Sequence, residues 1–135
     1  VMKDFFSAES YFKNTIKKYE KTFTPDIVVI NLGTNDNGLK ADGAQFKDGA
    51  KALIKLVRST YGQDVKIVWV TNMMGPFMQA YSMQAIKELG GEEKGLYFCT
   101  LTENRDGGLA HPSKAAHATA ANALAKFIRD NLLDK

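Results

Sequence analysis

Residues 27–33 read Ile-Val-Val-Ile-Asn-Leu-Gly, and the interpretation of the whole chain starts from this stretch. Its first four residues are all apolar and all β-branched. A strand with one face in solvent alternates apolar and polar residues, whereas a strand covered on both faces is apolar throughout. The run therefore predicts a strand of a parallel sheet with helices on both sides, and Gly33 opens the turn after it.

The segments on either side alternate between helical and strand patterns. After a loop rich in Asn, Asp and Gly (33–43), apolar residues at helical spacing predict a helix to about Thr60. Strands are expected at 65–71 and 96–101. The apolar face of the first of these helices consists of Phe46, Ala50, Leu53, Ile54 and Val57.

Three more helices are predicted from apolar residues at helical spacing. They are a helix at 8–22 with Phe12, Ile16, Tyr19 and Phe23; a helix opened by Gly75-Pro76 and closed by Gly90-Gly91, with Met78, Tyr81, Ala85 and Leu89; and a helix at 112–132 with Ala116, Ala120, Ala123, Leu124, Phe127 and Ile128 facing inward.

This alternation of helices and strands predicts an α/β fold. The expected form is a three-layer α/β/α sandwich around a parallel sheet, because parallel strands need crossover helices that pack on the sheet faces. Residues 1–135 are expected to belong to one domain. Three strands are fewer than the four to six of a typical sheet, so the domain is expected to be incomplete.

Composition narrows the functional classes. Eighteen basic and 15 acidic residues give a net charge of +3, and the basic residues are scattered, which argues against a nucleic-acid partner. No apolar run reaches the roughly 20 residues of a membrane span, and no signal peptide is visible, so no membrane association is expected. The single cysteine, Cys99, lies in an apolar run and is expected to be a buried structural thiol.

The candidate functional residues follow one strand and precede the last helix. They are Gly33-Thr-Asn35-Asp36 and His111-Pro-Ser113, and ligands of parallel sheets bind at the carboxyl ends of strands. His117 is expected to have a packing or hydrogen-bonding role. The two histidines are six residues apart rather than four, so no metal site is expected. No phosphate-binding glycine loop opens a helix, and no other cofactor is expected.

These runs carry a resemblance to a known family. Residues 26–36 resemble block three of the SGNH (GDSL-type) hydrolases, and residues 111–117 resemble block five. From about Thr24 to Phe127 the chain is most similar to the carbohydrate esterases of family two, which remove acetyl groups from xylan and related glycans. The resemblance implies the flavodoxin-like SGNH hydrolase fold, an acetylated carbohydrate substrate and a parent protein that is secreted or on the cell surface.

The resemblance also assigns roles to individual residues. It implies that Asn35, on the loop begun by Gly33, donates a hydrogen bond to the oxyanion, and that His111 is the general base. Asp36 is expected to hold the loop through local hydrogen bonds. The carboxylate that orients the histidine in many members is absent from its usual position. Asp106, Glu103 or a backbone carbonyl remain alternatives for this role, and Ala110 stands where an aromatic substrate platform is usual.

The resemblance lacks one block: SGNH hydrolases have their nucleophilic serine in a Gly-Asp-Ser segment, and this sequence contains no Gly-Asp-Ser. We therefore expect an N-terminally incomplete chain, the C-terminal part of an esterase whose nucleophilic serine lies outside it, and no activity from the chain alone. A degenerate relative, or a subunit completed by another chain, remains an alternative to truncation. Another SGNH lipase or acyl esterase, and a non-catalytic module that binds glycan or protein, remain alternatives. The strand at 26–32 would then have an uncovered edge, which predicts either self-association or an extra segment that covers this edge.

Overall fold

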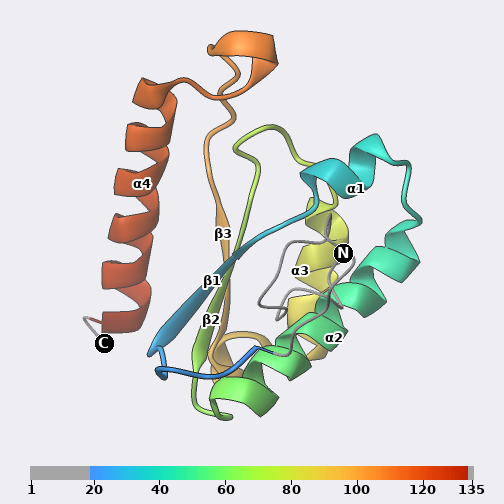
Figure 1. The fold of residues 1–135 in the computed structure, drawn as a ribbon, viewed down its shortest axis with the longest axis vertical. Helices are drawn as coiled ribbons and strands as arrows, with labels where there is room; N and C mark the ends of the chain where they lie inside the picture. Colours follow the sequence, from blue (N-terminus) through green and yellow to red (C-terminus); the bar gives the residue numbers. More distant parts are fainter. Residues whose placement is uncertain (1–18, 134–135) are drawn as a thin grey trace.

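The computed structural model describes residues 19–133 of the 135-residue chain, and its centre is a parallel sheet. In chain order, the strands are β1 (Ile27–Asn31), β2 (Lys66–Thr71) and β3 (Leu96–Thr100). Strand β2 lies between the other two, with Val29 opposite Val68 and Val68 opposite Tyr97. The carboxyl ends of all three strands therefore lie at one edge of the sheet, toward the top of Figure 1.

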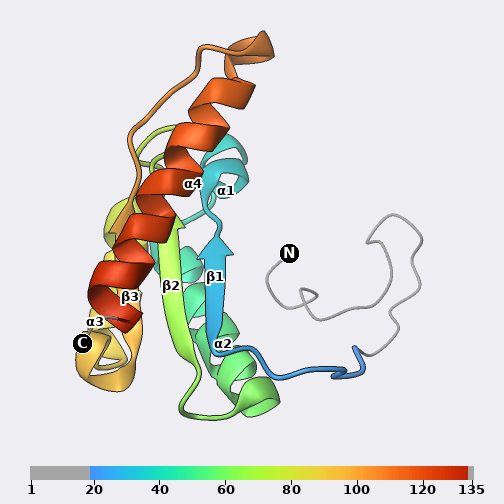
Figure 2. The ribbon, with the colours of Figure 1, turned by 90° about the vertical axis from the view of Figure 1, so that its left-hand side faces the viewer.

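Helices cover both faces of the sheet, with α2 and α3 on one face and α4 on the other (Figures 1 and 2). In chain order, the helical elements are α1 (Thr34–Gly38), α2 (Gly43–Tyr61), α3 (Gln79–Glu88), the 3-10 turns η3 (Gly91–Lys94) and η4 (Gly108–Ala110), α4 (Lys114–Ile128) and the π-helical turn η5 (Arg129–Leu133). This arrangement confirms the predicted α/β fold with a parallel sheet between helical layers. None of the helices within residues 19–133 has the length and apolar character of a membrane span.

Helix α2 follows the sequence prediction closely. The side chain of Asp42 caps its first turn by accepting a hydrogen bond from the Gln45 backbone N–H, at 2.9 Å. The helix ends at Tyr61 and is followed by Gly62, whose φ of 116° is accessible to glycine but unfavourable for other residues. All five apolar residues predicted for its inner face are buried: Phe46, Ala50, Leu53, Ile54 and Val57.

Alternation along the strands divides the core in two. Ile67, Trp69 and Leu96 belong to the cluster under α2 and α3, where the Trp69 ring meets Phe46 edge to face. Val68 and Cys99 point to the α4 side and belong to the second cluster. Cys99 is buried, as predicted, and this burial raises the pKa of its thiol.

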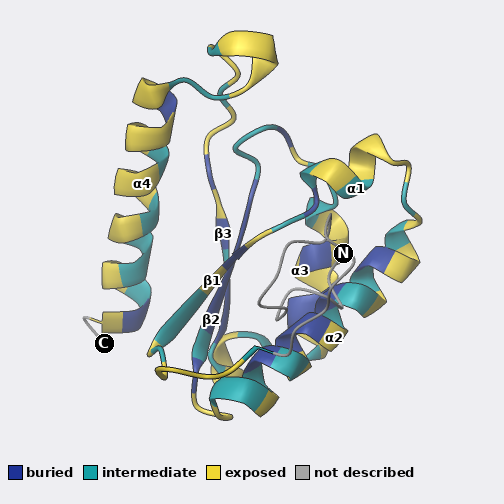
Figure 3. Cartoon of the chain, in the orientation of Figure 1, coloured by how far each residue is buried: buried dark blue, intermediate teal, exposed yellow. Residues whose placement is uncertain are grey.

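The layer formed by α4 covers the sheet incompletely, as Figure 3 shows by the exposed residues along β1. Ala120, Leu124, Phe127 and Ile128 pack against the second core cluster. Ala123, which the sequence pattern placed on the inner face, is exposed, so that part of the prediction is wrong. Val29 of β1 retains 43% exposure because α4 packs mainly over the other two strands.

The main differences from the predictions are the starts of two helices and a short helix within a predicted loop. Helix α3 begins at Gln79 rather than at Pro76, because residues 72–78 form tight turns in which Gly75 has a φ of 127° and Met78 a φ of 53°. Its buried face is therefore Ser82, Ala85 and Ile86, while Tyr81 is exposed. Helix α4 begins after Ser113, not at Pro112, because the Ser113 side chain accepts from the Ala116 N–H. The expected loop at 33–43 contains α1.

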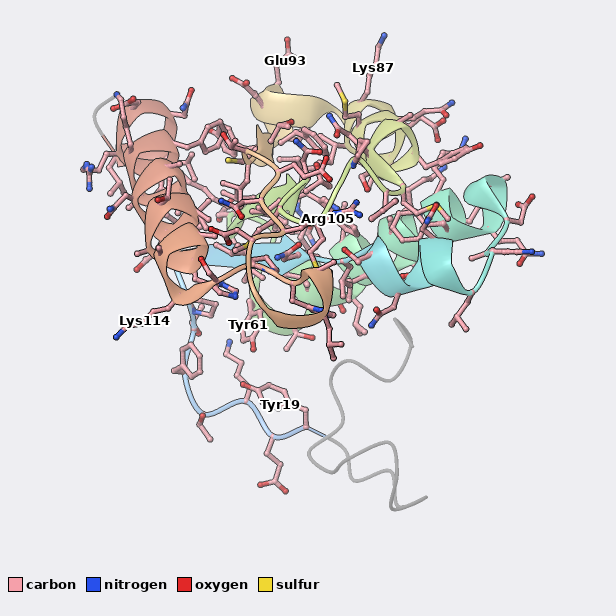
Figure 4. The ribbon with its side chains drawn as sticks, turned by 90° about the horizontal axis from the view of Figure 1, so that it is seen from above. Tyr19, Tyr61, Lys87, Glu93, Arg105 and Lys114 are labelled. Carbon is pink, nitrogen blue, oxygen red and sulfur yellow. The ribbon has the colours of Figure 1, made fainter. Side chains whose placement is uncertain are left out.

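The predicted helix at 8–22 lies mostly outside the described residues. Its described part, from Tyr19 onward, is not helical. The Tyr19 hydroxyl instead accepts a hydrogen bond from the Tyr61 hydroxyl at the end of α2, at 3.1 Å (Figure 4). This hydrogen bond raises the pKa of Tyr61 to about 12.

Candidate active site

The carboxyl ends of β1 and β2 border a cavity of about 240 Å³. Its walls come from the ends of β1 and β2, the turns after them, and the segment before α4. The polar or ionisable side chains among the lining residues are Asn31, Thr34, Thr71, Asn72, His111 and His117. The fold therefore brings the two candidate segments that the sequence singled out, around residues 33–36 and 111–113, to one place.

Gly33 fixes the turn at the end of β1. Its φ of 123° is a conformation that residues with side chains rarely adopt, and a Cβ there would lie 3.1 Å from both the Phe77 carbonyl oxygen and the Met78 Cβ. The chain then enters α1, where the Asn37 N–H donates to the Gly33 carbonyl at 3.2 Å. A glycine at position 33 therefore lets the chain turn at the end of β1, beneath the loop before α3, without strain or a Cβ clash.

Asn35 stands in the first turn of α1 and is exposed. Its neighbour Thr34 lines the cavity together with Leu32, whereas Asn35 is not among the lining residues. The structure thus places the loop that carries Asn35 at the cavity and leaves its carboxamide outside the lining. The oxyanion role of Asn35 remains a prediction.

His111 lies on the cavity wall and has a defined hydrogen bond. Its Nδ1 atom lies 2.9 Å from the carbonyl oxygen of Leu109. A carbonyl oxygen only accepts, so Nδ1 must carry the proton. In neutral imidazole this leaves Nε2 with its lone pair, which is the arrangement that a general base needs.

The two carboxylates proposed as alternatives are engaged elsewhere. Asp106 Oδ1 accepts from the Ser113 N–H at 3.0 Å, and hydrogen bonds from Ser113 lower the pKa of Asp106 below its usual value. Glu103 pairs with Arg105 Nε at 2.9 Å, and the Arg105 guanidinium lies 5.4 Å from the centre of the Phe77 ring. Of the three alternatives, the backbone carbonyl is the one that contacts the His111 ring.

The loop that presents this carbonyl has an unusual backbone. Leu109 and Ala110 have φ values of 54° and 55°, which is rare for residues other than glycine, and the Leu109 side chain is 94% exposed. Gly107 N–H donates to the His111 carbonyl at 2.8 Å and closes the loop. Strained backbone of this kind clusters at functional sites, but no sequence signal identifies a left-handed leucine.

Two cavity residues were missed or misjudged from the sequence. Thr71 was interpreted only as the end of a strand, yet it lines the cavity and is buried. His117, expected to have a packing or hydrogen-bonding role, is exposed and forms part of the cavity wall one turn into α4. An indication for Thr71 was available, because polar residues at the carboxyl ends of parallel strands are frequent site residues.

The serines of the described region have local structural roles. The hydroxyls of Ser59 and Ser82 donate to the backbone carbonyls of Leu56 and Met78, and Ser113 caps α4. Ser7 and Ser10 lie outside the described residues. Within residues 19–133, no group of three or more His, Cys, Asp or Glu side chains is placed to hold a metal ion.

Comparison with solved structures shows that this chain is similar in fold to part of several carbohydrate esterases. At the sequence level, neither a protein family nor a curated protein matches. At the structural level, the chain is similar to an active-site mutant of a family two carbohydrate esterase from Clostridium thermocellum, solved in complex with cellohexaose. That likeness has a TM-score of 0.74 and 29% identity, and it covers 86% of this chain and 39% of that one.

Two further structures share the fold. An acetyl xylan esterase from Butyrivibrio proteoclasticus has a TM-score of 0.79 at 19% identity, over 98% of this chain and 45% of the other. A family two carbohydrate esterase from Cellvibrio japonicus has a TM-score of 0.74 at 17% identity, over 87% and 36%. The chain therefore spans less than half the length of each of these proteins and corresponds to part of a carbohydrate esterase-like fold.

Proposed function

We propose that this chain is the histidine-bearing part of a serine esterase that removes acetyl groups from carbohydrates, with the nucleophilic serine outside the chain. The observation that carries the proposal is the His111 Nδ1 contact with the Leu109 carbonyl on the wall of the cavity. It leaves Nε2 available to a hydroxyl that enters the cavity from a neighbouring segment. The structural likeness to carbohydrate esterases supports the substrate class.

In the proposed reaction, the serine Oγ attacks the acetyl carbonyl carbon while His111 Nε2 takes the hydroxyl proton. The carbonyl electron pair moves onto oxygen, and Asn35 donates a hydrogen bond to this oxyanion at the loop that Gly33 shapes. The intermediate then expels the sugar oxygen, which receives the proton from His111. A water molecule, deprotonated by His111, releases acetate from the acetyl-serine and restores the serine.

The test uses the chain alone and the chain extended by the segment encoded upstream of Val1, each incubated with 4-nitrophenyl acetate and with acetylated xylan. The chain alone should show no turnover, because its nucleophile is missing. The extended protein should release acetate. His111→Ala should lower kcat by roughly 10⁴–10⁶-fold, and Asn35→Ala by about 10²–10³-fold.

A matched control is available on the same short helix. Asn37 is an exposed asparagine two residues after Asn35, and Asn37→Ala should leave kcat within about twofold. Equal losses in the two asparagine variants would contradict the oxyanion role. An extended protein that binds acetylated glycan without hydrolysing it would instead identify a non-catalytic binding module.

A further inference from the structure

Thr71, at the end of β2, has a polar group without a partner. The residue is 3% exposed, and within the part of the chain that the structure describes its hydroxyl has no hydrogen bond. Its backbone carbonyl, in contrast, accepts a hydrogen bond from the Leu101 N–H at 2.9 Å. Thr100, its register partner on β3, differs: that residue is exposed, and its hydroxyl accepts from Gln79 Nε2 at 3.4 Å.

A buried hydroxyl without a partner destabilises a fold, because it has lost its hydrogen bonds to water and gained none in return. Nearly all buried polar groups in native proteins are paired, so each exception calls for an explanation. Valine has almost the same shape and would fill this position without that loss. A threonine here is explained if its hydroxyl acquires a partner when the protein functions.

The cavity beside Thr71 is where a partner for its hydroxyl can bind. Thr71 lines the 240 Å³ cavity together with His111. The next residue, Asn72, has a φ of 79° and donates from Nδ2 to the Leu101 carbonyl at 2.8 Å, and its own carbonyl accepts from the Gly75 N–H at 3.1 Å. These bonds fix the end of β2, so Thr71 is held beside the cavity.

We propose that the Thr71 hydroxyl is a substrate-binding group that donates a hydrogen bond to an oxygen of the acyl ester. The proposal rests on the proposed esterase function and adds a residue to that site. Both ester oxygens only accept, which suits a hydroxyl donor. The cavity is smaller than the roughly 300 Å³ of typical ligand pockets, so it suits the ester group and its methyl rather than a sugar ring.

A small side-chain movement accompanies binding. The hydroxyl oxygen is itself covered in the unliganded chain, although other parts of Thr71 line the cavity. The staggered positions of a threonine side chain are about 120° apart, and one step about the Cα–Cβ bond moves the hydroxyl to a new position. This rotation moves the Thr71 hydroxyl from its buried position toward a ligand in the cavity.

The experiment measures stability and ligand binding on the chain itself, with Thr71→Val and Thr71→Ser as the variants. Thr71→Val keeps the shape and removes the hydroxyl, whereas Thr71→Ser keeps the hydroxyl. Thr100→Val is the matched control, since it removes a hydroxyl from the paired position on the next strand. The probes are an acetylated methyl xyloside and the same xyloside without acetyl groups, titrated while backbone amide shifts at residues 71–75 are recorded.

Thr71→Val should raise the melting temperature by about 3–6 °C, because the unpaired hydroxyl is gone. It should also weaken binding of the acetylated probe by about 3–10-fold, the loss expected for one neutral hydrogen bond. Thr71→Ser should bind within about twofold of the unmodified chain, Thr100→Val should leave binding and melting unchanged, and the unacetylated probe should bind more weakly than the acetylated one.

The proposal requires both effects of Thr71→Val. A melting temperature that is unchanged or lower overturns it, because the hydroxyl then has a partner within the fold. An unchanged affinity for the acetylated probe, or equal binding of the two probes, also overturns it. Neither measurement needs hydrolysis, so an extended protein without esterase activity would refute the proposed function while leaving this result to be judged separately.

Discussion

His111 Nδ1 and the Leu109 carbonyl oxygen lie 2.9 Å apart, across only two residues of the chain. The local geometry depends on the left-handed conformation of Leu109 and Ala110, which turns the carbonyl back toward the ring. In the proposed esterase, this backbone carbonyl would take the place that a carboxylate side chain occupies in a complete catalytic triad. Because the group that orients the ring belongs to the backbone, the side chain at position 109 can be changed without removing it.

Leu109→Gly should stabilise the protein by about 0.5–1 kcal/mol. A left-handed conformation costs an L-residue about 1–2 kcal/mol, and this gain exceeds the roughly 0.5–1 kcal/mol that glycine loses in conformational entropy. The Leu109 side chain is almost fully exposed, so little burial is lost. Urea unfolding monitored by circular dichroism gives the difference in the free energy of unfolding.

Leu39 provides the control for this substitution. It is also exposed, at 79%, but its φ is −84°, a conformation that leucine adopts without strain. Leu39→Gly should therefore lower the free energy of unfolding through the entropy of the unfolded chain alone. Equal effects of the two glycine substitutions would show that the backbone of Leu109 is not strained.

Glu88 on α3 should make the stability of the protein depend on acid pH. Its carboxylate accepts from Lys51 Nζ at 2.7 Å and from Lys47 Nζ at 2.9 Å, and these bonds from α2 lower the pKa of Glu88 from 4.5 to about 2. A lowered pKa in the folded state contributes stability above pH 4.5 that is lost as the pH falls toward 2. The melting temperatures of the unmodified chain and Glu88→Gln should therefore differ at pH 7 and converge near pH 2.

The control is Glu93→Gln, because Glu93 points away from the protein in Figure 4 and belongs to the turn after α3. This variant removes one negative charge but none of the bonds between α2 and α3. Its melting temperature should follow that of the unmodified chain across the same pH range. The difference caused by Glu88→Gln should also shrink in 1 M salt, since the ion pairs are partly exposed.

The sequence predicted those parts of the fold in which local pattern and tertiary packing agree. The β-branched run at 27–30 forms β1, and every apolar residue predicted for α2 is buried because the 3.6-residue period places them on one face. The start of α3 was not predictable from Pro76. Proline favours the first turn of a helix, but the hydrogen bonds between Asn72 and Gly75 form a separate turn there.

The site was predicted in its segments but not in its contacts. The strand-end rule places residues 33–36 and the His111 loop at the same edge of the sheet, and both contribute to the cavity. The partner of His111 was left open between two carboxylates and a carbonyl. The answer depends on the φ of Leu109, and nothing in its side chain signals that value. The unpaired Thr71 hydroxyl is equally invisible in the sequence, because it depends on every neighbour around it.

We predict that the protein self-associates through the edge of β1. It is an edge strand, and Val29 at its centre is 43% exposed. Uncovered apolar edge strands pair with other chains, and a lysine placed on such a strand prevents this. We expect the molar mass from light scattering to rise with concentration for the unmodified chain, and to stay at that of a monomer for Val29→Lys.

Met83→Lys is the control for the edge, because Met83 is exposed to a similar degree, at 49%, but lies on α3. It adds the same charge and removes a comparable apolar side chain. This variant should associate as the unmodified chain does. A monomer at all concentrations for the unmodified chain would contradict the prediction about β1.

An alanine substitution at Gly33, in the turn before the candidate oxyanion residue, can be compared with one at Gly62. The comparison distinguishes the strain of a positive φ from the strain of Cβ contacts. Both have positive φ values, 123° and 116°, but a Cβ at position 62 meets no atom within 4 Å, whereas one at position 33 meets Phe77 and Met78 at 3.1 Å. Gly62→Ala should thus cost about 1–3 kcal/mol for the backbone alone. Gly33→Ala should cost about 1 kcal/mol more in urea unfolding, because the loop before α3 must shift.

That shift moves the wall of the cavity, so Gly33→Ala should also weaken binding of the acetylated xyloside, while Gly62→Ala, at the opposite end of the sheet, should not. Equal costs for the two substitutions would mean that the α3 loop yields freely and does not hold the turn in place.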